Sequence, residues 1–193
     1  MAEQRIVLVD NDQTEKKNIK RMLTKLGYYV IGETGDGLNA LKMIRTRQPD
    51  LVIMDAGILG LDSLEVARII NEDKLAPVIL FASTQSQIVI ERAKEARVFA
   101  LLTKPVDEIT LFSTIELALA NYSEIIKLET EVKELKETLE NRKVMGKAKG
   151  ILMETLGISE AEAFRRMQKQ SMNSRISMYQ VAEAVILTHR LKD

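Results

Sequence analysis

Five short apolar runs, separated by stretches with helical spacing, constrain the fold more than any other feature of the sequence. The runs lie at Ile6–Val9, Tyr28–Gly32, Leu51–Met54, Val78–Phe81 and Phe99–Leu102. Between them apolar residues recur every three or four positions, as in Ile19, Met22, Leu23 and Leu26. Strands that alternate with helices form a mainly parallel sheet covered on both faces. We therefore predict an α/β domain over residues 1–121, with a doubly wound, five-stranded parallel sheet.

A long helical pattern follows, from about Asp107 onward, without a clear break. Within it, apolar residues alternate at spacings of three and four among glutamates and lysines: Ile125, Leu128, Val132, Leu135 and Leu139. This pattern is the a/d stripe of a coiled coil. We predict a coiled-coil linker helix over residues 122–143 that joins two copies of the chain in a homodimer. The alternative is a solvated helix that lies on its own domain.

The remaining residues, 144–193, carry the signals of three short helices. Gly157 is placed to end the first, and Ser159 with Glu162 and Ser177 with Gln180 match the capping box that begins a helix. The expected core of this small all-α domain comprises Ile151, Leu152, Leu156, Ala163, Met167, Val181, Ala182, Val185 and Ile186.

Composition excludes several classes of function. Cysteine is absent and His189 is the single histidine, so disulfides, thiol catalysis and multi-histidine metal sites are excluded. Basic and acidic residues balance at 28 each, which excludes a uniformly basic coat but not a local basic patch. No stretch approaches the roughly 18 apolar residues of a membrane span, and Met1–Arg5 does not resemble a signal peptide. We expect a cytoplasmic protein with no membrane contact.

Three charged residues follow three of the predicted strands. Asp10 follows the first run, Asp55 the third and Lys104 the fifth. The carboxyl ends of parallel strands meet at one edge of the sheet, so these side chains should converge. Two carboxylates suit Mg²⁺, and a carboxylate beside Mg²⁺ and a lysine can accept a phosphoryl group, because both cations neutralise its charge. The alternative for any single acid is a loop charge or a helix cap.

The C-terminal residues also carry a local excess of positive charge. From Val144 onward eight basic side chains oppose five acidic ones, Lys192 and Asp193 included. Candidate nucleic-acid contacts are Lys147, Lys149, Arg165, Arg166, Lys169 and Arg175. Such a cluster binds phosphates in a salt-sensitive way. Tyr179 either stacks on an unpaired base or packs against the core. Charge alone does not distinguish RNA from DNA.

The segments that end at Asp10 and Asp55, and the triplet Thr103-Lys104-Pro105, resemble the receiver domain of two-component response regulators over about Arg5 to Asn121. The resemblance implies a flavodoxin-like fold and a cis Lys104–Pro105 bond. It also implies Asp55 as phosphoacceptor, Lys104 as phosphate counter-charge, and an Mg²⁺ site formed by Asp10, Asn11, Asp55 and the carbonyl of Gly57.

The sequence departs from that family at several places. Asn11 stands where a second acid is usual, which should weaken Mg²⁺ binding, and Asp12 either compensates or caps the next helix. Ala82 stands where a Ser or Thr contacts the phosphoryl group, with Ser83 just beyond, so both are candidate phosphate contacts. Leu101 replaces the usual aromatic switch residue. Two possibilities follow: a phosphorylated receiver, or a receiver fold kept as a platform for a partner protein.

The C-terminal residues closely resemble the ANTAR domain, an RNA-binding output module of certain response regulators, from about Val144 to Leu191. The segments that carry the resemblance are Ala148–Met153, Gly157, Ser159–Phe164, Ser171–Met172, Arg175 and Val181–Ile186. ANTAR proteins bind leader RNA with two stem-loops of six-base loops, one module of a dimer on each loop, and thereby exclude a terminator hairpin.

The two resemblances together imply a response regulator that acts as an RNA-binding transcription antiterminator. Phosphorylation of Asp55 by a sensor histidine kinase would promote coiled-coil dimerisation and RNA binding. The alternative is an antiterminator with a degenerate receiver that a sequestering protein controls. A DNA-binding factor would need a helix-turn-helix, against which the ANTAR-like residues argue. A metabolic enzyme is not expected, because the phosphoacceptor site is the one acid–metal cluster.

Overall fold

The computed structural model describes residues 4–84 and 86–191, which form two compact units divided between Ile126 and Lys127. The predicted domain limits at residues 1 and 193 lie outside the described residues, as do the first residues of Met1–Arg5 and the charges of Lys192 and Asp193. No helix within the described ranges is long and apolar enough to cross a membrane.

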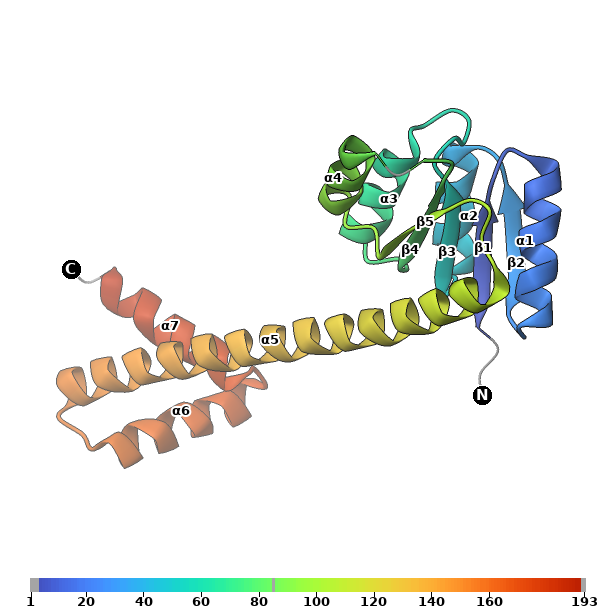
Figure 1. The fold of residues 1–193 in the computed structure, drawn as a ribbon. Helices are drawn as coiled ribbons and strands as arrows, with labels where there is room; N and C mark the ends of the chain where they lie inside the picture. Colours follow the sequence, from blue (N-terminus) through green and yellow to red (C-terminus); the bar gives the residue numbers. More distant parts are fainter. Residues whose placement is uncertain (1–3, 85, 192–193) are drawn as a thin grey trace. The chain divides into compact units, whose positions relative to one another are not determined.

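The first unit contains the predicted five-stranded parallel sheet (Figure 1). Each predicted run forms a strand, with bounds that differ by one or two residues: β1 Arg5–Val9, β2 Tyr29–Thr34, β3 Leu51–Asp55, β4 Val78–Ala82 and β5 Ala100–Thr103. The strand order is β2-β1-β3-β4-β5. The chain therefore reverses its direction across the sheet at β1, and β1 and β3 flank the switch point where sites form in such sheets.

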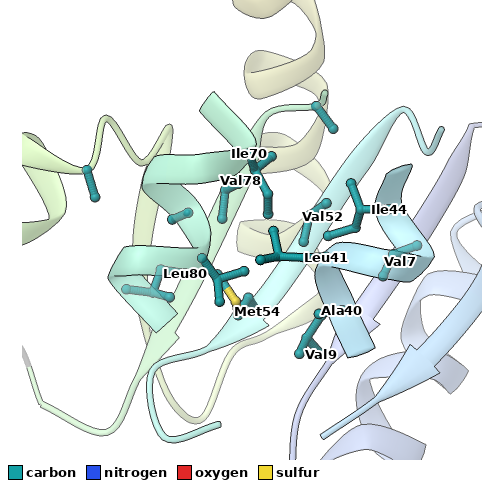
Figure 2. Close-up of a cluster of buried hydrophobic side chains, with 14 residues drawn as sticks. Val7, Val9, Ala40, Leu41, Ile44, Val52, Met54, Ile70, Val78 and Leu80 are labelled. Atoms are coloured by element: carbon teal, nitrogen blue, oxygen red, sulfur yellow. The ribbon is translucent and has the colours of Figure 1, made fainter. Parts of the chain in front are cut away.

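Helices cover both faces of this sheet: α1 Gln13–Lys25, α2 Gly37–Arg47, α3 Ser63–Glu72 and α4 Gln87–Glu95. Alternate strand residues point to opposite faces. One face packs against α2 and α3 through Val7, Val52 and Leu80 (Figure 2). The other face packs against α1 and the helix that begins at Glu108, through Ile53 and Phe81. Because both faces are buried, the strands are apolar throughout.

A single helix, α5, runs from Glu108 to Leu156 through both predicted domain boundaries. Its first turns contribute Leu111, Ile115 and Ala118 to the core of the first unit. The five residues of the predicted a/d stripe come next, and each exposes between 44% and 69% of its surface in the single chain. An exposed stripe of this spacing on a polar helix predicts a partner helix.

The second unit packs the end of α5 with α6 Glu160–Ser174 and α7 Met178–Arg190. Its core contains Ala148, Met167, Val181 and Ala182, with Leu152, Val185 and Ile186 packed against them. The prediction was wrong for Leu156, which is 48% exposed, because it lies in the last turn of α5, just before the chain turns.

Two of the three predicted helix-end signals are confirmed in full, and the third is confirmed in part. Gly157 follows the end of α5 with a φ of 62°, a conformation that glycine adopts readily. Ser177 and Gln180 form the complete capping box at α7. At α6, Ser159 accepts from the amide of Glu162 as predicted, but the Glu162 carboxylate accepts from Arg166 Nε at 3.3 Å rather than closing the box.

We expect Ile53→Ala to destabilise the first unit by about 2–5 kcal/mol, because Ile53 is fully buried at the centre of β3 and its truncation leaves a cavity. The matched control is Ile88→Ala on α4, where 73% of the side chain is exposed and the change should stay within about 0.5 kcal/mol. Urea unfolding of both variants measures the difference. Equal effects would show that the central strand is not the core.

Candidate functional site

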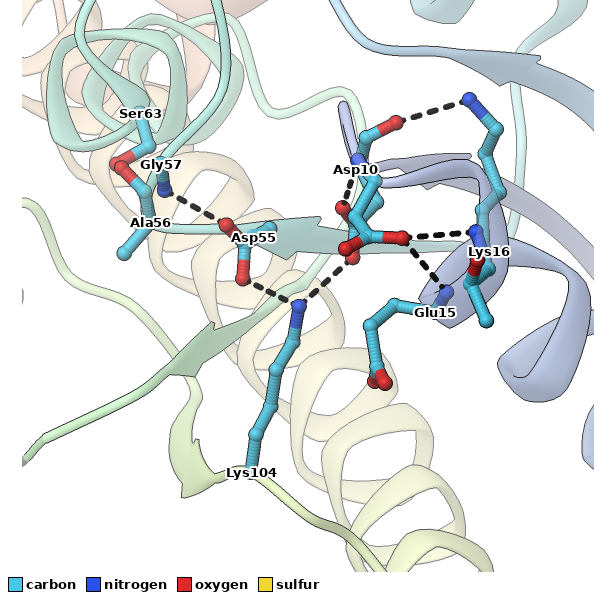
Figure 3. A network of polar contacts seen from close by, with 10 residues as sticks. Asp10, Glu15, Lys16, Asp55, Ala56, Gly57, Ser63 and Lys104 are labelled. Carbon is cyan, nitrogen blue, oxygen red and sulfur yellow. Dashed lines mark hydrogen bonds and ion pairs between the residues drawn. The ribbon is translucent and has the colours of Figure 1, made fainter.

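Three charged side chains converge at the carboxyl edge of the sheet, as the sequence predicts (Figure 3). Asp10 follows β1, Asp55 ends β3 and Lys104 follows β5. The ammonium of Lys104 lies 2.8 Å from Asp10 Oδ2 and 2.6 Å from Asp55 Oδ2. Lys104 thus bridges the two carboxylates of neighbouring strands from across β4.

Backbone amides hold the second oxygen of each carboxylate. The amide of Asp12 donates to Asp10 Oδ1 at 2.8 Å, and the amide of Gly57 donates to Asp55 Oδ1 at 2.8 Å. Each acid is therefore fixed at one oxygen by the main chain and at the other by an ammonium. This arrangement leaves both side chains little rotational freedom.

The charge balance of the site favours the protonated lysine. Burial of Lys104 opposes its charged form, but hydrogen bonds to Asp10 and Asp55 and their negative charges outweigh that effect and raise the pKa of Lys104. The lysine is therefore an ammonium at neutral pH. It presents fixed positive charge next to Asp55, where phosphoryl oxygens would need it.

Lys16 is a second cationic side chain at this site, and it was not among the predicted site residues. Only 6% of its surface is exposed, and its Nζ donates to the carbonyl of Asp10 at 2.9 Å. A signal was present, because Lys16 precedes the buried Ile19 and Leu23 by three and seven positions and so falls on the inward face of α1. A lysine on that face needs an oxygen partner.

Asp10 and Asp55 bring two carboxylates together at this edge, and Mg²⁺ commonly binds through one or two carboxylates and water. Of the other predicted ligands, Asn11 follows Asp10 in the chain and is exposed, and Gly57 contacts Asp55 through its amide. Asp12 caps α1, accepting from the amides of Thr14 and Glu15, so of its two predicted roles the cap is observed. Among residues 4–84 and 86–191, no three or more acidic or histidine side chains gather into a metal site.

The residues that usually report phosphorylation differ here as the sequence indicates. Ala82 ends β4, is buried, and offers no hydroxyl, although its carbonyl accepts from the amide of Lys104 at 3.0 Å. Ser83 follows it and is exposed. Leu101 is half-buried against the cluster on the α2 and α3 side. The Lys104–Pro105 bond is cis, as the resemblance implies.

The predicted nucleic-acid contacts fall into separate groups on the second unit. Lys147 and Tyr179 line one groove between α5 and α7, together with Lys143 and Arg190. Lys143 was not among the predicted contacts, although Lys143 and Lys147 are four residues apart and so share a face of one helix.

The other candidates lie elsewhere. Arg165, Arg166 and Lys169 are exposed on α6, and Arg166 also pairs with Glu162. Arg175 is the left-handed C-cap of α6. Lys149 forms an ion pair with Glu160 across the α5–α6 turn, so Glu160 partly neutralises its positive charge.

Comparisons with known proteins match both parts of the chain. A model of the response regulator receiver domain matches residues 6–116, and a model of the ANTAR domain matches residues 133–186. The transcriptional regulatory protein PdtaR of Mycobacterium tuberculosis (strain H37Rv) is 35% identical over 184 residues, 95% of this chain and 90% of that protein. Protein PilH of Pseudomonas aeruginosa is 33% identical over 119 residues, 60% of this chain and 98% of that protein.

A solved structure shares the fold of the first unit. The signal receiver domain of a modulated diguanylate cyclase from Desulfovibrio desulfuricans G20 aligns with a TM-score of 0.60 and 28% identity, covering 63% of this chain and 97% of that chain.

Removal of the bridging cation should destabilise the first unit. Lys104→Met leaves two mostly buried carboxylates without their partner and should lower the free energy of unfolding by about 3 kcal/mol at neutral pH. Because the folded-state pKa of Lys104 is raised above about 10.5, its stabilisation is complete below that pH and is lost as the pH rises through the folded-state value.

Urea unfolding at pH 7 and in the alkaline range checks this expectation. The control is Lys94→Met on α4. The Lys94 side chain is 67% exposed and pairs with Glu91, three residues before it, so the change should alter stability by less than about 0.5 kcal/mol. Equal stability of Lys104→Met and the wild type would mean that the acids do not need the lysine.

Proposed function

The chain belongs to the response regulators in which a receiver domain is followed by an ANTAR domain, and from this premise we propose that it is an RNA-binding transcription antiterminator gated by phosphorylation of Asp55. The observation that carries the proposal is the ammonium of Lys104 held between Asp55 and Asp10 at the carboxyl edge of the sheet. That geometry suits a carboxylate that accepts a phosphoryl group.

In the proposed transfer, a carboxylate oxygen of Asp55 attacks the phosphorus of a donor, the P–O bond forms, and the leaving group departs with the electrons of its own bond to phosphorus. The amide of Gly57 orients the carboxylate, and the ammonium of Lys104 neutralises charge on the phosphoryl oxygens. Asp10, Asn11, Asp55 and the carbonyl of Gly57 would hold Mg²⁺, which supplies further charge neutralisation when bound. A sensor histidine kinase is the corresponding phosphodonor.

A second candidate mechanism of control rests on the altered residues that usually report phosphorylation. Ala82 has no hydroxyl to contact a phosphoryl group and Leu101 has no aromatic ring. Both changes favour a receiver that a partner protein sequesters without phosphorylation. In this version the RNA-binding function is the same and only the input differs.

The ANTAR unit supports the RNA-binding part of the proposal by its charge. Exposed cations lie on α6, at Arg165, Arg166 and Lys169, and on α5 and α7, at Lys147 and Arg190. Cations on separate helices suit the curved backbone of an RNA hairpin, whose unpaired loop bases side chains can read. The proposed ligand is leader RNA with two stem-loops of six-base loops.

The exposed stripe of α5 supports a homodimer. Ile125, Leu128, Val132, Leu135 and Leu139 form an a/d seam that two copies of the chain would bury against each other. Two linked modules then bind two loops of one RNA, and the second binding event profits from a high effective concentration. Phosphorylation of Asp55 is proposed to shift the monomer–dimer equilibrium.

RNA binding by the full-length chain should respond to a phosphodonor. We expect acetyl phosphate with Mg²⁺ to lower the Kd for a two-hairpin RNA by at least about tenfold, within the usual range of coupling between sites. Asp55→Asn should abolish this response. Asp73→Asn, which removes an exposed carboxylate at the end of α3, should retain it. Fluorescence anisotropy measures both. Wild-type binding that ignores the phosphodonor would support control by a partner protein.

The coiled-coil seam is tested independently of RNA. Leu135→Asp places a charge at the centre of the stripe in both copies and should raise the dimer Kd by about 100-fold or more, because two buried leucines are lost. Glu134→Gln, at the neighbouring polar position, should leave the Kd unchanged. Sedimentation equilibrium of the phosphorylated chain reports the result, and an unchanged mass for Leu135→Asp would contradict the proposed seam.

A further inference from the structure

A groove of about 590 Å³ runs between the C-terminal half of α5 and α7, wholly within the second unit. Its volume falls in the range of ligand sites, about 300–1,000 Å³. Aliphatic side chains of both helices line it, and Tyr179 stands among them at the first turn of α7. The groove therefore combines an apolar wall with an aromatic ring.

A carboxylate lies one helical turn beyond Tyr179 on α7. Hydrogen bonding to this Glu183, partial burial, and the charges of Glu183 and Glu140 raise the pKa of Tyr179. The phenol is therefore neutral at neutral pH. A neutral aromatic ring that lines a groove is the kind of surface on which unpaired bases stack.

Charged side chains surround this ring in a pattern that fits one unpaired nucleotide. Lys143, Lys147 and Arg190 bring positive charge for phosphates, and Glu140 and Glu183 bring hydrogen-bond acceptors. Carboxylates in such positions accept from the exocyclic amino groups of bases. Adenine, cytosine and guanine carry such a group, and uracil does not.

The position of the groove on α5 leaves it open in the proposed dimer. With Leu135 at d and Leu139 at a, Glu140 and Lys147 fall at b and Lys143 at e. Position e borders the seam, and position b lies farther from it. A second copy of the chain bound along the seam would therefore not fill the groove.

From this placement we infer that the groove receives one unpaired, amino-bearing base of an RNA loop, stacked on Tyr179 with its amino group donating to Glu183 or Glu140, while Lys143, Lys147 and Arg190 hold the adjacent phosphates. The inference rests on the proposed RNA-binding function and adds to it a base-reading subsite. It assigns to Glu183 a specificity role that a positively charged surface alone does not provide.

The test uses the full-length chain and a pool of two-hairpin RNAs whose six-base loops are randomised. Sequencing the bound fraction should show uracil depleted at one loop position for the wild type. Glu183→Gln should lose this depletion, because a glutamine amide both donates and accepts. Glu154→Gln, an acid of the same unit outside the groove, should keep it.

The affinity of Tyr179 variants for one selected RNA distinguishes a loss of base stacking from a defect in folding. Tyr179→Leu should weaken binding about tenfold or more, whereas Tyr179→Phe, which keeps the ring, should stay within about threefold of the wild type. Circular dichroism confirms that each variant is folded.

The outcomes distinguish the inference from the function on which it rests. If the wild type binds RNA and the groove variants match it in affinity and in uracil depletion, the subsite is overturned and the RNA-binding function stands. Groove variants that change the sedimentation of the chain but not its RNA binding would assign the groove to a protein contact instead. Absence of wild-type binding to the whole pool would overturn both.

Discussion

The ammonium of Lys104 between Asp10 and Asp55 is the interaction on which the first unit's site depends. The strand order places β1 and β3 side by side, so the sheet brings the two carboxylates together whether or not they are neutralised. An unpaired charge in a mostly buried place is costly, and a cation beside it offsets much of that cost. The cation comes from Lys104 after β5, and Lys16 adds a second ammonium on the Asp10 carbonyl. The topology that builds the acidic site thus also requires its lysine.

Helix α5 is one continuous helix whose apolar face changes its position along the chain. Leu111 and Ile115 pack on the sheet, the a/d stripe follows as far as Leu139, and Val144 and Ala148 then pack against α6 and α7. These last two fall at heptad positions f and c, away from the a and d positions of the stripe. The seam therefore ends where the core of the second unit begins. The seam, that core and the groove use different faces of the same helix.

The sequence predicts the elements of this fold well and its side-chain pairings less well. Strands such as β3 are recognisable because their apolar runs are buried on both faces, and the convergence of Asp10, Asp55 and Lys104 follows from parallel strand ends. The exposure of Leu156 was not predictable from spacing, because the helical pattern continues to the last turn while the packing partner does not. The pairing of Lys149 with Glu160 and the groove around Tyr179 join residues 11 to 50 positions apart, and local periodicity carries no information on such contacts.

Ala82 has no hydroxyl and Leu101 has no ring, whereas Lys104 contacts Asp55 directly and lies just before α5 in the chain. Under the proposed function, phosphoryl oxygens on Asp55 compete with Asp10 for the Lys104 ammonium. Three residues after Lys104, the carboxylate of Asp107 accepts from the amides of Ile109 and Thr110 and caps α5. A pull on Lys104 therefore acts through a short stretch of backbone on the first turn of α5. Since α5 carries the seam as well, this route from Lys104 would couple the proposed phosphorylation to the proposed dimerisation.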